Sequence, residues 1–521
     1  MTGNGEWADE LQELARRRAM GTQMGGAERM ARHHARGRLT ARERIGRCTD
    51  DGSFTEIGVL AGAGTYDEHG ALQDVSPAET ITGLAEIAGT RVVVEAWDAS
   101  VKRGAAESIS REKIIYAERL AYEYRYPVIR LVDTAGATVV KHQVDGYADL
   151  PAREPQWNFF GLLGRVPVLS ACLGPCAGLG AVFVCTSHFS VMVKQVSQVF
   201  AGGPPVVARA TGEVIDKEEL GGAAVHTRGS GVVDNAAEDE DDAFRQLRMV
   251  LSYLPASVRE VPGRGPADDP PGRRDEQLAG IIPRNPRTAY DVRRLIRHVV
   301  DRDSFFEIGR YNGGSQVTGL ARLDGYPVGI LANDPKVYAG AMTVSSSEKF
   351  VRFVDMCDTF NIPMVNFVDV PGAAVGRQAE AAGTVRHVLR VACATDQVSV
   401  PWFTVWVRRA FGLGASTHGP QRGANLRVAW PSANWGSIAM EGGVDAAFRR
   451  ELESAEDPDA MRLEILEQLR RLQSPMRTAE HFGIEDVIDP RETRPRLCRW
   501  ITDAQRLLPD IAHERGRTMR P

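Results

Sequence analysis

The stretch Val132-Asp133-Thr134-Ala135-Gly136-Ala137 returns later in the chain as Val368-Asp369-Val370-Pro371-Gly372-Ala373, at an offset of 236 in the numbering. A second stretch, Gly178-Leu179-Gly180-Ala181, returns as Gly412-Leu413-Gly414-Ala415 at an offset of 234. One such match would mean little, because glycine–alanine pairs are common. Two matches in the same order, at nearly the same offset, indicate that the chain holds two copies of one domain.

Further matches extend the repeat beyond these motifs. Thr82-Gly83-Leu84-Ala85 recurs as Thr318-Gly319-Leu320-Ala321, again at an offset of 236. Upstream, the stretch 53–58 corresponds to the stretch 304–309 at an offset of 251. Because the upstream offset is the larger one, we expect one surface insertion in the first copy, downstream of Gly58. A long period with a single insertion predicts two homologous domains, not a solenoid of small units.

The bulk composition excludes several classes of protein. A chain of 521 residues is too long for one core, and its 43% hydrophobic and 25% charged residues are ordinary for a globular protein. The net charge of −5 argues against a nucleic-acid partner. No apolar run approaches the ~20 residues needed to span a bilayer, and the N-terminus lacks an apolar signal core. We therefore expect a cytoplasmic protein with no membrane partner.

Cysteine and histidine usage gives no sign of a metal site. Seven cysteines are scattered along the chain. Cys172 and Cys176 are four apart, which is not the spacing of a zinc ribbon, and no second pair follows. The histidines also lack metal-like spacing. We expect seven reduced thiols, several of them buried, and no metal in this chain.

Short apolar runs that alternate with helical patterns predict an α/β fold with covered sheet faces. We expect strands at 92–94, 128–132, 166–172, 328–331 and 364–368, and helices at about 111–124, around 351–356 and at 458–472. The segment from Pro255 to Pro286 holds seven prolines and predicts a linker. The expected domains are therefore residues 1–262 and 287–521, joined by the linker 263–286.

Residues 7–48 are charged and rich in arginine. Thr40 and Glu43 predict a capping box that starts a short helix running into Ile45. The basic run Arg32–Arg44 has two interpretations. The commoner one is a solvated helix face, and the other is a docking surface for an anionic cofactor tail or a partner subunit.

The repeated motifs suit one kind of chemistry. Each follows or ends an apolar strand, where glycine lets the backbone approach a ligand and leaves N–H groups free at a helix start. Two such groups from different loops form an oxyanion hole. The alternative is that the glycines only pack strand against helix. Ser170 and Ser190 lack the context of a nucleophile elbow, so a site of backbone donors without a side-chain base favours enolate stabilisation.

Several further stretches are distinctive: 37–45 (Gly-Arg-Leu-Thr-Ala-Arg-Glu-Arg-Ile), 173–178 (Leu-Gly-Pro-Cys-Ala-Gly), 218–222 (Glu-Glu-Leu-Gly-Gly), 346–349 (Ser-Ser-Glu-Lys), 367–372 (Phe-Val-Asp-Val-Pro-Gly) and 429–431 (Ala-Trp-Pro). In this order they resemble the carboxyltransferase (β) subunit of biotin-dependent acyl-CoA carboxylases, the propionyl-/methylcrotonyl-CoA carboxylase family. The resemblance covers nearly the whole chain. It implies two tandem homologous crotonase-like (ClpP/crotonase superfamily) β/α domains.

The resemblance also implies a mechanism with two oxyanion holes. One hole holds the thioester oxygen of an acyl-CoA while the α-carbon becomes an enolate, and it comprises Gly136, Ala137, Gly178 and Gly180. The other holds the ureido oxygen of carboxybiotin and comprises Gly372, Ala373, Gly412, Gly414 and Ala415. The small residues after the second pair of motifs predict an acyl pocket with room for a branched or longer group, shaped by Ala373, Ala374, Ser416 and Thr417.

Three stretches differ from the commonest pattern of that family. Residues 134–138 lack a glycine and an arginine, residues 371–376 lack an aromatic residue, and residues 412–417 replace Gly-Gly-Ala-Tyr. These changes leave open which acyl-CoA is the substrate. They also keep open a diverged, non-catalytic homologue that binds CoA esters or scaffolds an assembly. A biotin-dependent decarboxylase or transcarboxylase is a further alternative, because one sequence does not set the direction of the reaction.

The expected partners follow from what the sequence lacks. Ala439-Met440-Glu441 has no lysine for biotinylation, and no glycine-rich ATP-binding region is present. We therefore expect biotin on a separate biotin carboxylase/biotin carrier chain and an acyl-CoA as substrate. The resemblance implies a homo-hexamer built as a trimer of dimers, in which the first domain of one chain faces the second domain of its partner.

Overall fold

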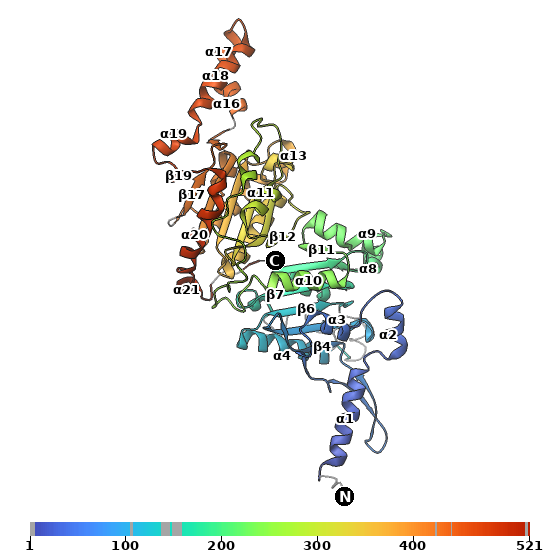
Figure 1. Ribbon diagram of the computed structural model, residues 1–521. Coiled ribbons are helices and arrows are strands. Elements are labelled where there is room, and N and C mark those ends of the chain that lie inside the picture. The colour runs from blue at the N-terminus through green and yellow to red at the C-terminus, as the bar shows by residue number, and fades with distance from the viewer. Residues whose placement is uncertain are drawn as a thin grey trace. The chain divides into compact units, whose positions relative to one another are not determined.

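The computed structural model describes residues 6–104, 108–136, 146–147, 159–422, 425–438, 440–515 and 519–520. The chain forms two compact units, one ending at Ser252 and the other beginning at Tyr253 (Figure 1). The proline-rich segment belongs to the second unit, where Leu278 is buried in the core and Arg273 Nε donates to Asp269 Oδ1 at 2.8 Å. The domain boundaries at 262 and 286 stay predictions.

A seven-stranded sheet organises the first unit, in the order β1-β4-β5-β6-β7-β9-β11. The first three strands are antiparallel and the rest are parallel. The central strands are fully buried on both faces, as their runs of β-branched and apolar residues predict. The strands are β1 Thr55–Ile57, β4 Thr80–Ile87, β5 Thr90–Trp97, β6 Val128–Val132, β7 Val168–Cys172, β9 Phe189–Val193 and β11 Asn235–Ala237.

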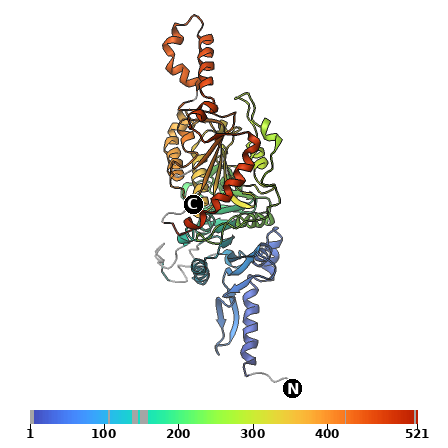
Figure 2. The ribbon, with the colours of Figure 1, turned by 60° about the vertical axis from the view of Figure 1, so that its left-hand side comes forward.

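The described helices of the unit are α1 Ala8–Thr22, α2 Ala27–His34, α3 Ala41–Cys48, α4 Ser108–Tyr124, α6 Phe159–Leu162, α7 Leu179–Cys185, α8 Pro204–Thr211, α9 Lys217–Gly221 and α10 Glu240–Leu251. Of these, α3, α4, α7 and α10 pack on this sheet. Shorter helical turns are η1 Lys102–Gly104 and η2 Val225–Ser230, and β8 Pro175–Ala177 pairs in parallel with β10 Gln198–Phe200. The predicted insertion is a hairpin of β2 Gly62–Tyr66 and β3 Leu72–Pro77 beside α1 (Figures 1 and 2). Arg16 on α1 donates to the carbonyl of Leu72 at 3.1 Å.

The second unit repeats the pattern with the order β12-β13-β14-β15-β16-β17-β19, and β18 also pairs with β16. Again the first three strands are antiparallel and the others parallel. The two sheets confirm the predicted pair of homologous β/α domains. The strands are β12 Phe306–Ile308, β13 Gln316–Leu323, β14 Tyr326–Asn333, β15 Met364–Val370, β16 Trp402–Phe411, β17 Leu426–Ala429, β18 Asn434–Gly436 and β19 Asp486–Val487.

The helices of this unit are α11 Val292–Val299, α12 Val344–Thr359, α13 Arg377–Ala381, α14 Thr384–Asp396, α15 Gly412–Ser416, α16 Met440–Ala447, α17 Arg449–Ser454, α18 Pro458–Leu472, α19 Pro475–Glu480, α20 Thr493–Gln505 and α21 Leu508–Ile511. Helical turns are η3 Glu276–Gly280, η4 Tyr338–Gly340 and η5 Pro490–Glu492. Val444, Leu452 and Leu466 form a small separate core between α16, α17 and α18.

The repeat holds at the level of single hydrogen bonds. Val93 on β5 pairs in register with Val128 on β6, and the equivalent residues Gly329 on β14 and Met364 on β15 pair in the same way. In both units the amide of the first residue donates to the carbonyl of a proline, Pro127 or its equivalent at 363. Proline has no N–H to lose from the ladder at that strand start. The strands and helices expected from the sequence all form, and α18 has the predicted bounds.

Among the described residues, no helix is both long and apolar enough to cross a membrane. All seven cysteines are free thiols, and Cys172 and Cys176 are buried with their sulfur atoms 3.5 Å apart.

Candidate functional site

In the first unit the two repeated motifs lie in contact. A Cβ atom built on Gly136 would lie 2.3 Å from the carbonyl oxygen of Ala177, and one on Gly180 would lie 2.8 Å from that of Thr134. Side chains are therefore excluded where β6 and the start of α7 meet. Gly136 and Gly178 also have positive φ angles, of 78° and 53°, which favour glycine. Ala137 lies outside the described residues.

The hydrogen bonds of this pair differ from residue to residue. The N–H of Gly136 donates to Thr134 Oγ1 at 3.1 Å, and the N–H of Gly178 donates to the carbonyl of Phe200 at 3.1 Å. Gly180 lies in the first turn of α7, where an α-helix supplies no acceptor for its N–H groups. The amide of Gly180 is thus the one of these three best placed to bind a ligand oxygen.

The second unit brings its motifs together in the same way. A Cβ atom on Gly414 would lie only 2.7 Å from the carbonyl carbon of Gly372. The loop after β15 is fixed by Met342, whose N–H donates to Gly372 O at 3.0 Å and whose carbonyl accepts from Ala374 at 2.8 Å. Ala373 bridges to the same methionine.

The remaining predicted residues differ in whether the short helix α15 supplies an acceptor for their N–H groups. Gly412 and Gly414 lie in its first turn, where the helix supplies none, whereas α-helical geometry pairs the N–H of Ala415 with the carbonyl four residues earlier. Thr417 is buried and its hydroxyl donates to Gly414 O at 2.9 Å. Ser416 is exposed, and its hydroxyl donates to Leu413 O at 2.9 Å. Thr417 therefore supports the turn from inside the protein, and the acyl-pocket interpretation stays a prediction.

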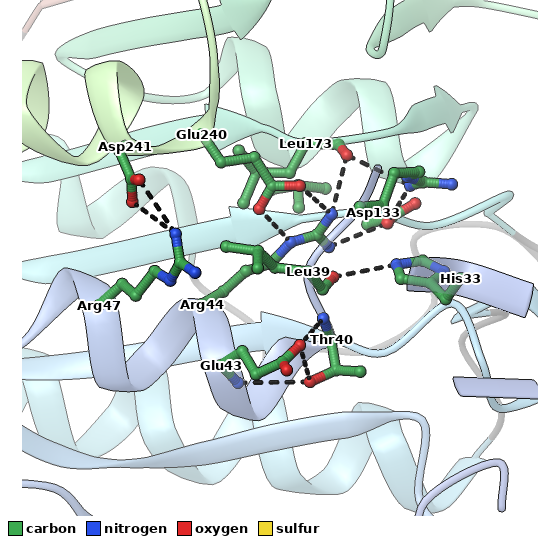
Figure 3. Close-up of polar contacts among 12 residues, drawn as sticks. His33, Leu39, Thr40, Glu43, Arg44, Arg47, Asp133, Leu173, Glu240 and Asp241 are labelled. Atoms are coloured by element: carbon green, nitrogen blue, oxygen red, sulfur yellow. Dashed lines mark hydrogen bonds and ion pairs between the residues drawn. The ribbon is translucent and has the colours of Figure 1, made fainter. Parts of the chain in front are cut away.

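The aspartate of the first motif is the centre of a buried ion network (Figure 3). Arg44 on α3 donates through Nη1 to Asp133 Oδ2 at 2.9 Å and through Nε to Glu240 Oε2 at 2.7 Å. Arg38 also binds Asp133. The side chain of Arg44 is 1% exposed. The prediction of a solvated helix face is wrong here, because the basic run supplies the counter-ions of two buried carboxylates. The predicted Thr40–Glu43 capping box is confirmed.

The aspartate of the second motif has two arginine partners from another source. Arg408 Nε lies 3.0 Å from Asp369 Oδ2, and Arg409 Nε lies 2.8 Å from Asp369 Oδ1. Both arginines come from the neighbouring strand β16. In each unit, then, the buried aspartate is neutralised and held by the protein itself, and it serves as an anchor for the glycine loop.

A second polar cluster is duplicated almost residue for residue. Arg42 binds Glu56 at 2.8 Å, and Arg293 binds Glu307 at 2.6 Å, with both residues displaced by 251 in the numbering. A lysine in the second turn of α4 and another in the second turn of α12 lie beside these pairs. Burial lowers the pKa of Lys113 to about 8 and that of the equivalent lysine at 349 to about 7, against the opposing effect of the nearby glutamate. These clusters tie the first strand of each sheet to a helix.

Sequence reasoning missed two buried residues behind the second glycine pair, Asn333 and His418. Both are at most 1% exposed, and burial lowers the pKa of His418 to about 4. The repeat held a signal for the first of them. At the offset of 236, Asn333 is the counterpart of Trp97, so a polar residue replaces an aromatic one at an equivalent buried position.

The described residues contain no group of three or more His, Cys, Asp or Glu side chains that could hold a metal ion. The two serines considered as nucleophiles have structural roles. Ser170 Oγ donates to the carbonyl of Phe183 at 3.1 Å, and Ser190 Oγ donates to Asp234 at 3.1 Å. The site therefore offers backbone donors on two converging loops in each unit, which suits stabilisation of a developing oxyanion.

Comparison with known proteins agrees with this geometry. The model of the carboxyl transferase domain matches residues 32–507, which span both units. The chain belongs to the carboxyl transferase domain family. Carboxyl transferase relatives match over nearly the full length. The carboxyltransferase subunit of propionyl-CoA carboxylase from Haloferax mediterranei is 38% identical over 519 residues, covering 97% of this chain and 98% of that protein.

Other members of the family carry different names. Methylmalonyl-CoA decarboxylase subunit alpha from Veillonella parvula is 34% identical and covers 91% of both chains. The crystal structure of transcarboxylase 12S, described as a hexamer with methylmalonyl-coenzyme A and methylmalonic acid bound, is 30% identical. It superposes with a TM-score of 0.87, covering 100% of this chain and 98% of that one. The match confirms the fold class and the carboxyltransferase assignment.

Proposed function

We infer that this chain is the carboxyltransferase subunit of a biotin-dependent acyl-CoA carboxylase. It transfers the carboxyl group of carboxybiotin to the α-carbon, or the vinylogous carbon, of an acyl-CoA. The observation that carries this inference is the duplicated glycine pair, brought into contact within each unit, in a chain that matches the carboxyl transferase domain over both units.

The first unit takes the acyl-CoA. The N–H of Gly180 donates to the thioester oxygen, and Gly136, Ala137 and Gly178 form the surrounding cradle. As the α-carbon loses its proton, negative charge grows on that oxygen, and a preset donor stabilises it by about 3 kcal/mol. No side chain near the described glycines is placed as a base, which is consistent with proton removal by the second substrate.

The second unit takes the biotin side through Gly372, Ala373, Gly412, Gly414 and Ala415. Its donors are uncharged backbone groups. The two nearby arginines are bound to Asp369, so a phosphate or carboxylate would meet no free positive charge from them. A neutral ureido oxygen fits this donor set. Carboxybiotin supplies the carboxyl group and, once that group has left, the nitrogen that takes the α-proton.

The substrate is propionyl-CoA, and its carboxylated product is methylmalonyl-CoA. Relatives named for these two thioesters are 38% and 34% identical to this chain. The decarboxylase and the transcarboxylase among the relatives favour a second candidate, in which partner subunits run the same transfer from methylmalonyl-CoA. Both candidates use the same two sites.

Fixation of labelled bicarbonate into a panel of acyl-CoAs tests the proposal. We expect labelled methylmalonyl-CoA from propionyl-CoA, ATP and bicarbonate only when a biotin carboxylase and biotin carrier chain is added. The chain alone should fix nothing, because it has neither the lysine nor the ATP site. Turnover without the partner, or a strong preference for acetyl-CoA over propionyl-CoA, would overturn it.

The assembly that fits this function is a hexamer of three dimers, each active site combining the first unit of one chain with the second unit of its partner. Transcarboxylase 12S is described as a hexamer. Co-expression of Gly180→Val and Gly414→Val chains tests the shared site. In a mixed dimer one site collects both lesions and the other has none, so random pairing should restore about a quarter of wild-type activity. A mixture that stays inactive would place both halves of the site in one chain.

A further inference from the structure

A directed chain of hydrogen bonds joins the two loops of the second glycine pair. The backbone N–H of Asp369 donates to Asn333 Oδ1 at 3.0 Å, so the amide nitrogen of Asn333 faces the other way. That nitrogen lies 3.1 Å from Nε2 of His418. Nδ1 of the same ring lies 2.7 Å from the carbonyl oxygen of Gly414. A carbonyl only accepts, so Nδ1 carries the proton and Nε2 accepts from Asn333.

We propose that Asn333 and His418 are positioning residues for the biotin side of the active site. They hold the loop that follows Asp369 and the turn that contains Gly414 at one fixed separation. The inference rests on the proposed function, which assigns this glycine pair to carboxybiotin. Neither side chain touches the substrate. Each acts through a backbone group of a loop that does.

The narrowness of the site explains why such a fixed separation matters. Gly414 and Gly372 approach so closely that no Cβ atom fits between them. Displacement of a binding group by about 1 Å can cost about 10²-fold in rate, because the reacting atoms lose their alignment. The chain of hydrogen bonds binds the first loop at the N–H of Asp369 and the second at the carbonyl of Gly414. A shift of either loop therefore breaks a buried bond, which costs free energy.

Both the backbone and the ring of His418 are held in place. The backbone carbonyl of His418 accepts from Asn366 Nδ2 at 3.0 Å and from Thr404 Oγ1 at 3.2 Å. Phe350 on α12 packs against the ring edge-on, with centroids 5.7 Å apart. The groups that face the ring are thus uncharged: an amide, a hydroxyl at Thr417, a carbonyl and a phenyl ring. Without a charged partner the imidazole stays neutral, which is the form that can donate at one nitrogen and accept at the other.

The first unit shows that the fold does not require this polar chain. Trp97 occupies the position equivalent to Asn333 and packs on Phe183 of α7, with ring centroids 4.8 Å apart. The indole Nε1 is buried and has no hydrogen-bond partner among the described residues. An apolar contact therefore supports the acyl-CoA pair, whereas a hydrogen-bonded pair supports the biotin pair. The difference points to a role in the second site rather than in the scaffold.

Transfer of the carboxyl group from methylmalonyl-CoA to free biotin tests the proposal on the full-length oligomer. We expect His418→Ala to raise the KM for biotin by about tenfold or more, with the Kd for propionyl-CoA, measured by calorimetry, within about twofold of wild type. His418→Gln should recover most of the loss, because a glutamine amide can still donate and accept. Asn333→Asp, which keeps the size and the acceptor but loses the donor, should resemble His418→Ala.

His188 supplies the matched control. It is a buried histidine of the first unit that accepts at Nδ1 from Val168 N–H at 3.0 Å and lies 2.9 Å from Leu163 O through Nε2. His188→Ala should lower thermal stability while leaving the KM for biotin unchanged.

The outcomes distinguish failure of the positioning role from failure of the proposed function. An unchanged KM for biotin in folded His418→Ala and Asn333→Asp chains overturns the positioning role. An equal loss of propionyl-CoA affinity, or an equal rise of KM in the His188 control, overturns it as well. If the wild-type chain transfers no carboxyl group to biotin at all, the proposed function itself fails, and this inference falls with it.

Discussion

The two units share a sheet, a register and a pair of glycine loops, yet they anchor those loops by different means. Asp133 in the first unit takes its arginines from the N-terminal segment, with the pair to Arg44 spanning 89 residues. Asp369 in the second takes both from the adjacent strand β16, where the pair to Arg408 spans 39 residues. The buried aspartate is the constant feature of the fold, and its counter-ions are not. The first anchor depends on long-range docking of α3, while the second is built into the sheet.

The largest expected effect separates these two anchors. Arg44→Met leaves Glu240 buried beside Asp133, which keeps only Arg38 of its two arginines, and breaking a buried ion pair on one side costs about 3–5 kcal/mol. Arg408→Met leaves Asp369 with Arg409, so its cost should be clearly smaller. Denaturant unfolding followed in both variants measures the difference. Equal losses in the free energy of unfolding would show that the distant docking of α3 adds nothing.

The next effect separates the roles of the two glycine pairs. A valine at Gly180 or Gly414 must displace backbone or side-chain atoms of the facing loop, so each should lower overall turnover by an amount equivalent to about 3 kcal/mol. Gly180→Val should weaken propionyl-CoA binding, whereas Gly414→Val should leave it nearly intact and impair transfer to biotin. Binding of propionyl-CoA measured by calorimetry distinguishes them. An equal loss of affinity in both variants contradicts the division of labour.

Much of the fold could be predicted from the sequence because the repeat and the apolar runs are local patterns. The strand 128–132 and the helix 458–472 form with the expected bounds. The partners of Asp133 could not be predicted in this way. An arginine on α3 shows the same periodicity whether it faces water or a carboxylate, and Glu240 lies 196 residues away from Arg44. Whether a charged side chain is buried depends on how its helix packs in the tertiary structure, and the periodicity of the helix carries no information about that packing.

The candidate site divides along the same line. Glycine motifs at strand ends were visible, and the structure brings each pair together. The sequence did not show which of these backbone amides already have acceptors, because the hydrogen bond from Gly178 N–H to Phe200 O depends on the pairing of β8 with β10. His418 was hidden because a lone histidine after a glycine motif has no recognisable spacing. Only the exchange of Trp97 for Asn333 between the two copies pointed to a polar interior there.

A smaller effect should come from the acidity of the buried imidazole. The pKa of His418 is about 4, below its ordinary value of 6.5, because burial disfavours the charged ring. Between these values the unfolded chain binds the proton and the folded chain does not, so stability falls as the pH falls. Lowering the pH from 7 to 5 should cost the second unit about 2 kcal/mol through this group. His418→Gln should lose that part of the pH dependence. An identical pH profile in the variant would refute the buried neutral ring.

The smallest expected effect compares the equivalent caps of α3 and α11. Thr40 caps α3 with a full capping box, and Asp291, its counterpart at the offset of 251, caps α11 by accepting from the N–H of Arg294 at 3.1 Å. Loss of such a cap costs about 1 kcal/mol. Because α3 also carries Arg44 into the ion network, fraying of its first turn should loosen that docking, and Thr40→Ala should cost more than Asp291→Ala. Amide hydrogen exchange on the two helices measures this: protection should drop along all of α3 in the first variant but only near the first turn of α11 in the second. If both losses stay confined to the first turn, the cap of α3 and its ion network act independently.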